Sequence, residues 1–357
     1  MTKDPQRKMQ DILDRLTIDG KELGLQLAVY HHGELIVDAW SGVMNKHSRQ
    51  NVDKNTLFPV FSTFKGVIAT LIHILAESNI LDYNQRISEV WPAFGSRGKE
   101  EITLRDLLTH SAGLSQLSSR VTVEDLNDWD LMCEKIADLK VRWPRGTYCL
   151  YNPVTYSWTV GEFLRRITGR EIMDLVRAEI GIPLDIKDMY CGLPDEAEPR
   201  VATIYEPDAD PRTFIYGIPQ CTMPLSNWMN RADVRRASIP SSNAITNAEG
   251  LARMYAALLQ DGVDGVRLFP EDRLNAALEP FYAKNGGSPT FGIGYAIFAM
   301  NEDANPRVTE FGHHGFGGIA AYADRVNCVT VAMTKNVLSE NDTWPLVLRE
   351  LKDSLGL

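Results

Sequence analysis

Hydrophobic positions follow a helical period after Ser62 and a strand-like pattern near the N-terminus. Apolar side chains three or four residues apart lie on one face of a helix, so the stretch that follows Ser62 predicts a helix. Its apolar positions are Val67, Ile68, Leu71, Ile72 and Leu75. Residues 25–30 and 34–40 are apolar runs on either side of His31-His32-Gly33, which is typical of a β-hairpin.

The rest of the pattern predicts helices at both ends of the chain and further strands near its C-terminus. We predict helices over residues 5–16 and 343–355. We predict strands over residues 291–300, 319–324 and 326–334. Between about residues 60 and 260 the pattern is mostly helical, and loops with proline and glycine interrupt it.

Two sets of strands at opposite ends of a chain most simply form one antiparallel sheet. We therefore expect an α+β fold, an α/β sandwich in which the terminal helices flank the sheet. Residues 1–60 and 265–357 form the expected sheet lobe, and residues 61–264 form a mostly helical lobe inserted into it. Small-molecule sites commonly lie between lobes, so we place the site there.

Composition narrows the classes of partner. The 357 residues are 44% hydrophobic and 24% charged, and the formal net charge of −10 argues against nucleic acid or an anionic membrane as partner. Five scattered cysteines without Cys-x-x-Cys spacing indicate neither a disulfide framework nor a zinc site. No long apolar segment or signal-peptide pattern is evident, so we expect a cytoplasmic protein. The pattern carries no information on oligomeric state.

A serine and a lysine three positions apart form the first candidate for chemistry. Ser62 and Lys65 lie on one face of the predicted helix, where a desolvated lysine amine can act as base toward the serine hydroxyl. The alternative is that Ser62 caps the helix and Lys65 is a solvated charge. Ser96 and Lys99 have the same spacing but lie in a glycine-containing loop, so we favour the first pair.

The second motif is a Pro-Arg-Gly-Thr turn followed by Tyr151. Together with Ser62-Thr63-Phe64-Lys65, it resembles the serine β-lactamase and penicillin-binding-protein superfamily, in particular its class C β-lactamase-like esterase branch, which is related to family VIII esterases and fungal transesterases. The resemblance implies that Tyr151 is the catalytic tyrosine. A phenol beside a cationic lysine is stabilised as phenolate and can shuttle the serine proton. Tyr148 and Tyr156 are the alternatives.

The asparagine of this motif departs from the family pattern. Class C enzymes carry Tyr-x-Asn, whereas Asn152 follows Tyr151 directly. Asn152 is nevertheless our candidate for substrate binding. Residues 102–114 and 239–244 extend the resemblance, and we interpret His110 within the first of them as structural rather than catalytic.

The third motif is the glycine-rich stretch 311–318, which precedes a predicted strand. In the superfamily this edge strand carries Lys-Thr-Gly or a variant such as His-Thr-Gly. The resemblance implies that His313 takes the lysine position and that His314 and Gly315 contact substrate. It also implies that the backbone N–H groups of Ser62 and Phe316 form an oxyanion hole. Adjacent strand residues face opposite ways, so a metal pair of the two histidines is not expected.

These motifs predict a serine hydrolase that forms an acyl-enzyme, first of all an intracellular esterase acting on a small ester. Neither a metal nor an organic cofactor is implied. An acyltransferase of a specialised metabolite and a non-catalytic ligand-binding or scaffolding protein are the alternatives. Two irregular segments carry aromatic and methionine side chains that either line the substrate pocket or form core beneath loops. These side chains are Trp129, Met132, Tyr190, Tyr205, Phe214, Tyr216, Met223, Trp228 and Met229.

Overall fold

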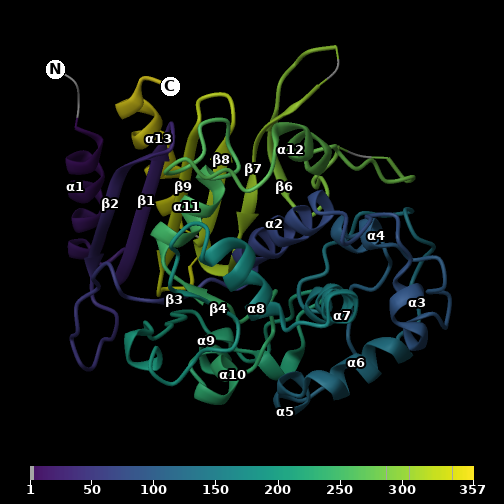
Figure 1. The fold of residues 1–357 in the computed structure, drawn as a ribbon. Helices are drawn as coiled ribbons and strands as arrows, with labels where there is room; N and C mark the ends of the chain where they lie inside the picture. The colour runs from purple at the N-terminus through teal and green to yellow at the C-terminus, as the bar shows by residue number, and fades with distance from the viewer. Residues whose placement is uncertain (1–3, 287, 305, 340) are drawn as a thin grey trace.

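A six-stranded antiparallel sheet with helices on both faces organises the molecule (Figure 1). The computed structural model describes residues 4–286, 288–304, 306–339 and 341–357. The strand order is β2-β1-β9-β8-β7-β6. The strands are β1 (Gly24–His31), β2 (Glu34–Gly42), β6 (Ala296–Met300), β7 (Val308–His314), β8 (Ala320–Asp324) and β9 (Val329–Lys335). The predicted α+β class and the single sheet built from both ends of the chain are confirmed.

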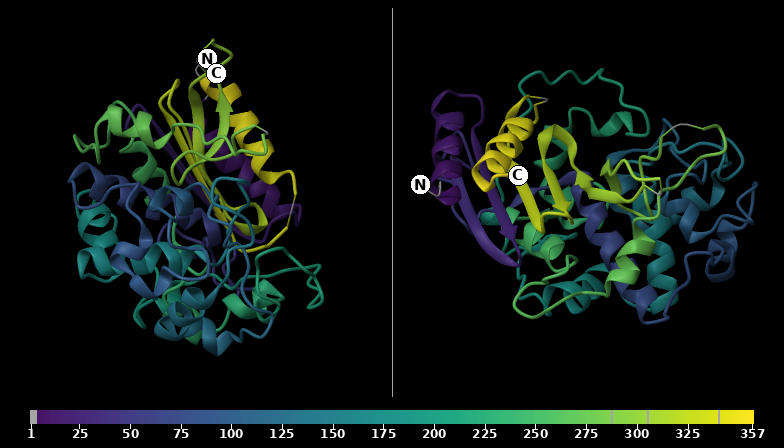
Figure 2. Two further views of the ribbon diagram at one scale, coloured as in Figure 1. Left: turned by 90° about the vertical axis from the view of Figure 1, so that its right-hand side faces the viewer. Right: turned by 90° about the horizontal axis from the view of Figure 1, so that it is seen from above.

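Alternating side chains cover both faces of this sheet. Leu25, Leu27 and Val29 of β1 pack in the cluster formed with the terminal helices α1 (Pro5–Ile18) and α13 (Thr343–Leu355). Ala28 and Tyr30 point to the opposite face and join the larger core. Figure 2 shows the two terminal helices side by side on one face of the sheet. Burial of each large apolar side chain contributes roughly 1.5–3 kcal/mol.

The helical part of the chain surrounds α2 (Phe64–Glu77). This helix is buried on nearly all sides, which is typical of a central helix rather than a surface one. The other helices are α3 (Ile87–Val90), α4 (Leu104–Leu108), α5 (Val123–Asn127), α6 (Trp129–Asp138), α7 (Tyr156–Thr168), α8 (Ile172–Val176), α9 (Leu225–Met229), α10 (Ala232–Arg236), α11 (Ala248–Ala256) and α12 (Glu271–Ala277). A small sheet of β3 (Phe58–Pro59), β5 (Ile245–Thr246) and β4 (Met189–Tyr190) joins distant loops.

The structure differs from the predicted strands at three places, one of which is a strand that we did not predict. Strand β7 is absent from our predicted strands because its sequence contains Gly312 and two histidines, which weaken a strand pattern. The strand predicted over 291–300 begins only at Ala296, because the chain bends over residues 292–295, where Gly294 has φ 89°. The strand predicted from residue 326 begins at Val329, because Cys328 at φ 51° belongs to the preceding turn.

Helix α11 packs against β1, β8 and β9, although it lies within the segment that we assigned to the helical lobe. This helix thus contacts the sheet across the predicted boundary between the lobes. The division of the chain into a sheet lobe (1–60 and 265–357) and a helical lobe (61–264) stays a prediction. Residues 1–3, 287, 305 and 340 of the predicted sheet lobe lie outside the described residues. Among the described residues, no helix is both long enough and apolar enough to cross a membrane.

Candidate active site

Ser62 lies in a 3₁₀ turn, Phe61–Thr63, directly before α2, and Lys65 lies in the first turn of that helix. The Nζ of Lys65 is 3.0 Å from the Oγ of Ser62. Ser62 makes no capping bond to the helix, and its hydroxyl instead donates to the carbonyl of Ser241 at 3.3 Å. The geometry thus contradicts the alternative in which Ser62 is a helix cap and Lys65 a solvated charge.

The Lys65 amine is completely buried. It has three partners: the Oγ of Ser62, the carbonyl of Pro153 at 2.8 Å and the carbonyl of Ser241 at 3.0 Å. Burial lowers the pKa of Lys65 well below its ordinary value because the charged form loses its hydration. A neutral amine can donate its two hydrogens to the two carbonyls, and its lone pair can accept the Ser62 hydrogen once the hydroxyl turns away from the Ser241 carbonyl.

The backbone holds the serine in a tight turn. Phe61, just before the serine, has φ 49°, a left-handed conformation that is uncommon for an aromatic residue and that tends to occur at functional sites. Gly315 packs against this turn so closely that a Cβ on it would lie 2.5 Å from the carbonyl oxygen of Val60. The end of β7 is therefore fixed beside Ser62.

Tyr151 faces the same site. Its ring centroid lies 5.0 Å from the Lys65 amine and its ring stacks on Phe291. The hydroxyl is buried and has no hydrogen bond of standard geometry, although Ser62 lies near enough to influence its pKa. Burial raises the pKa of Tyr151, and the Ser62 hydroxyl offsets this only in part. Burial therefore favours the neutral phenol over the phenolate that we expected from the sequence, and a neutral Lys65 would supply no charge to stabilise an anion.

The two alternative tyrosines lie elsewhere. Tyr148 is 44% exposed and packs against Trp143. Tyr156 is buried in α7, and its ring lies 5.6 Å from the Lys65 amine. Neither lines the cavity that opens at Ser62, whereas Tyr151 does.

His110 supports the loop that carries Tyr151, as the structural interpretation predicts. Its buried Nδ1 accepts a hydrogen bond from the backbone N–H of Asn152 at 3.3 Å, and its ring packs edge-on against Tyr151. Burial lowers the pKa of His110 well below its ordinary value. Asn152 itself is buried and is not among the residues that line the cavity, so the structure does not bring it together with the other substrate-binding candidates.

The two histidines of the third motif differ in surroundings. His313 is 4% exposed, and its ring lies near the rings of Tyr151 and Phe291. His314 is exposed and packs on Phe298. Both line the cavity, with Gly315 and Phe316 beside them.

Ser241 and Ser157 are site residues that the sequence argument missed. The Ser241 carbonyl accepts from both Lys65 and Ser62, while its Oγ donates to the Pro153 carbonyl at 2.8 Å. Ser157 lies beneath it, with its Oγ 2.7 Å from the Ser241 Oγ and accepting from the Ser241 N–H at 3.0 Å. The only signal was the resemblance of residues 239–244 to the family.

A cavity of about 470 Å³ opens at Ser62 between β6, β7 and the helical part of the chain. Its walls are mostly apolar and aromatic. Of the aromatic and methionine side chains singled out from the irregular segments, Tyr216 and Trp228 line it, whereas Met132 and Met229 are core residues. The cavity is formed by Phe61, Ser62, Tyr151, Pro153, Val154, Ile215, Tyr216, Ile218, Thr222, Leu225, Trp228, Ser242, Thr290, Phe291, Ala296, Phe298, His313, His314, Gly315 and Phe316.

The β-lactamase family pattern matches residues 7–353. The chain belongs to the β-lactamase family. It is 30% identical to the esterase/β-lactamase LipL of Mycobacterium tuberculosis (strain ATCC 25618 / H37Rv), over 94% of this chain and 81% of that protein. The crystal structure of a family VIII carboxylesterase matches with a TM-score of 0.84 and 26% identity, over 98% of this chain and 97% of that one.

A penicillin-binding-protein homologue from Caulobacter crescentus also matches, with a TM-score of 0.84 and 31% identity, over 99% of this chain and 97% of that one. These likenesses confirm the resemblance to the class C-like esterase branch of the superfamily. As a member of the β-lactamase family with esterase relatives, the protein is a serine hydrolase.

Ser96 and Lys99, the second Ser-x-x-Lys pair of the protein, do not contact each other in a catalytic arrangement. The Lys99 amine is bound to the carbonyls of Ala137 and Leu139 at the end of α6. The Ser96 hydroxyl donates to the carbonyls of Ala93 and Ala137, at 3.5 and 3.3 Å. Lys99 therefore caps a helix instead of activating a serine.

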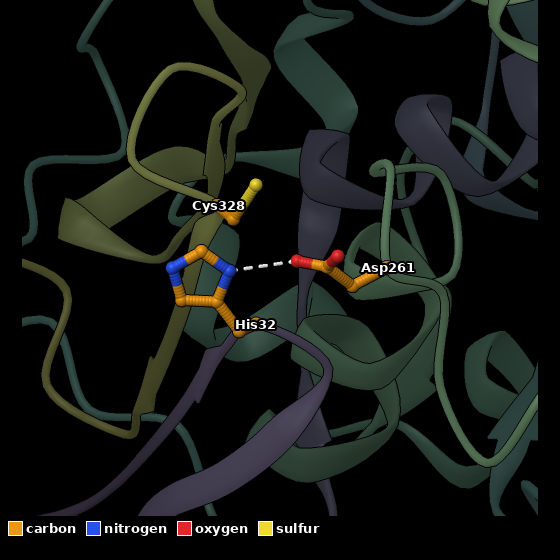
Figure 3. A group of neighbouring side chains, drawn as sticks. All are labelled: His32, Asp261 and Cys328. Carbon is orange, nitrogen blue, oxygen red and sulfur yellow. Dashed lines mark hydrogen bonds and ion pairs between the residues drawn. The ribbon is translucent and has the colours of Figure 1, made fainter.

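A group of side chains that can ligate metals lies where β1 ends and β9 begins (Figure 3). His32, Asp261 and Cys328 place their ligand atoms within 4.8 Å of one another. The Nδ1 of His32 is 2.7 Å from an oxygen of Asp261, which also interacts with the Cys328 thiol. Because Asp261 partners both side chains, hydrogen bonding among them accounts for the group. All five cysteines are free.

Proposed function

We propose that the protein is an esterase that cleaves small, largely apolar esters through an acyl-enzyme on Ser62. The observation that carries this proposal is the 3.0 Å contact between the buried Lys65 amine and the Ser62 hydroxyl at the edge of an apolar cavity. A weak nucleophile such as serine needs a base within hydrogen-bond reach. The esterases among the relatives support the same reaction class.

Lys65 acts as the base in this proposal. With its hydrogens directed to the carbonyls of Pro153 and Ser241, the neutral amine takes the Ser62 proton as Oγ attacks the ester carbonyl. The carbonyl becomes a tetrahedral oxyanion. Backbone N–H groups of Ser62 and Phe316 are our candidates to stabilise it, because the packing of Gly315 on the Val60 carbonyl keeps these two segments adjacent.

Tyr151 acts as a proton donor rather than as an anion. Its neutral hydroxyl can protonate the departing alkoxide and regain a proton from the Lys65 ammonium. Loss of the alcohol leaves an ester between the acyl group and Ser62. Water activated by the same groups then attacks this ester, which releases the acid and restores Ser62 and Lys65.

Two other functions remain as alternatives. In an acyltransferase, an alcohol instead of water would resolve the acyl-enzyme, and the apolar cavity walls would favour this by limiting water. A non-catalytic binding protein would keep the cavity without acylation, and the intact Ser62, Lys65 and Tyr151 argue against it. A cytoplasmic location also stays a prediction.

Intact-protein mass spectrometry tests the proposal. Wild type is incubated with a fluorophosphonate and, separately, with p-nitrophenyl esters of increasing chain length. We expect one adduct on wild type and on Ser96→Ala, and none on Ser62→Ala. Ser96→Ala is the matched control because Ser96 begins the second Ser-x-x-Lys motif, which lies outside the site. Absence of any adduct on wild type would contradict the proposal, and added alcohols would separate hydrolysis from acyl transfer through their ester products.

A further inference from the structure

The described residues in the walls of the active-site cavity carry no formal charge. Within that part of the chain, no aspartate, glutamate, lysine or arginine lines the cavity. The guanidinium group of Arg142 lies outside, over the ring of Tyr216 at 5.9 Å, and it binds Gln116. Lys65 is buried, and its amine already has three partners. A carboxylate that entered this cavity would lose its hydration without gaining a cation.

His313 presents a hydrogen-bond acceptor rather than a charge. Its Nδ1 is 2.7 Å from the carbonyl oxygen of His314. A carbonyl oxygen only accepts, so Nδ1 carries the hydrogen and Nε2 carries a lone pair. Burial lowers the pKa of His313 to about 3, so the ring is neutral at physiological pH.

Three buried polar atoms of the described residues around this cavity have no partner, and one of them is the Tyr151 hydroxyl to which the reaction already assigns a role. The other two are the Nε2 of His313 and, on a second wall, the indole N–H of Trp228. Buried polar groups in folded proteins are rarely left unpaired, so such atoms at a binding cavity indicate hydrogen bonds that a ligand completes. One atom accepts and the other donates, which suits an uncharged polar group such as an amide or a hydroxyl.

We propose that this site selects uncharged esters that bear a hydrogen-bond donor for the Nε2 of His313, and that it rejects esters bearing a carboxylate. This inference rests on the proposed esterase function. A cation at the position of His313 would select the opposite class, because it would attract a carboxylate and repel a donor such as a protonated amine. His313 is thus a specificity-determining residue.

Four p-nitrophenyl esters of similar length test the inference. They are the ester of hexanoic acid, the half-ester of glutaric acid, and the esters of N-acetyl-β-alanine and of its N-methyl derivative. We expect kcat/KM for the glutarate ester to be at least about a hundredfold below that for the hexanoate. We expect the ester with an amide N–H to exceed its N-methyl counterpart by at least about tenfold, because only the former can pair with Nε2.

Charge reversal at His313 provides the second measurement. His313→Lys should raise the glutarate-to-hexanoate ratio of kcat/KM at least about tenfold and remove the preference for the amide N–H. His47→Lys is the matched control, since it makes the same substitution at an exposed position outside the cavity, and both preferences should persist.

The outcomes separate the two proposals. Equal turnover of the glutarate and hexanoate esters by wild type, or no preference for the N–H, would overturn the inference even if Ser62 is acylated. The two wild-type ratios decide this even if His313→Lys does not fold. Failure of every ester to acylate Ser62 would instead overturn the esterase function itself.

Discussion

The same four-residue motif occurs twice in this chain, and only one copy forms a site. In the first, the Lys65 amine is buried next to the Ser62 hydroxyl. In the second, the Lys99 amine is also buried but binds the last carbonyls of α6, away from the Ser96 hydroxyl. Burial of the lysine and its spacing from the serine are therefore insufficient to form a catalytic pair. The difference lies in the partners of the amine, because one lysine has a hydroxyl among them and the other has only carbonyls.

Substitution of each lysine by methionine gives the largest expected contrast. Lys65→Met removes the base and should lower kcat/KM by about a thousandfold or more. Lys99→Met should leave kcat/KM within about twofold and lower the free energy of unfolding by about 1–3 kcal/mol, because the carbonyl of Leu139 loses its partner. Ester hydrolysis assays measure kcat/KM, and urea unfolding measures the free energy of unfolding, for each of the two variants. Equal loss of activity in the two variants would remove the distinction between the motifs.

The tyrosines near Lys65 sharpen the comparison. Tyr151→Phe should lower kcat by about 10²–10⁴-fold, the range typical of a lost general acid. Tyr156→Phe is the matched control, since its ring lies at a similar distance from the Lys65 amine but outside the cavity. Pre-steady-state release of p-nitrophenol reports the acylation step directly. A larger effect at Tyr156 would mean that Tyr151 is not the proton donor.

In the first motif, hydrogen bonds from Ser157 hold Ser241, which in turn contacts Ser62 and Lys65. Ser157→Ala removes the hydrogen bonds that hold Ser241, whose carbonyl contacts both Lys65 and Ser62. We expect kcat to fall about tenfold to a hundredfold through misplacement of these groups, and Ser96→Ala to leave it unchanged. If Ser157→Ala changes only the melting temperature, Ser157 is structural and has no part in positioning.

The pH dependence of stability should show the smallest difference. Because the pKa of Lys65 is lowered in the folded state, the unfolded chain binds a proton there that the folded chain lacks, at pH values between the lowered pKa and about 10.5. The free energy of unfolding should therefore rise with pH through this window. Lys65→Met should reduce this slope, as urea unfolding at pH 7 and pH 9 would measure. An unchanged slope would mean that Lys65 is charged in the folded protein.

Some parts of the site could be predicted from side-chain identity and spacing. The helical period after Ser62 predicted the helix that aligns it with Lys65, and the motif at residue 151 distinguished Tyr151 from its neighbours. The terminal helices and the N-terminal hairpin followed from their apolar patterns.

Other parts depend on tertiary structure, which local pattern does not encode. Ser241 contacts Lys65 through a carbonyl, a group that every residue has, so its sequence gives no signal. The neutral states expected for Lys65 and Tyr151 come from burial, not from neighbours in the chain. Strand β7 combines a glycine with two histidines, and pairing with β6 and β8 overrides their weak strand preference.

The position of β9 in the sheet has a consequence for synthesis. The N-terminal hairpin of β1 and β2 joins the other strands only through β9, which is the last strand along the chain. While a ribosome is still translating roughly the first three hundred residues, the hairpin lacks β9, its neighbouring strand, and the sheet is incomplete. Long-range pairing of this kind is slow to form. Esterase activity should thus emerge only after nearly the whole polypeptide has been made.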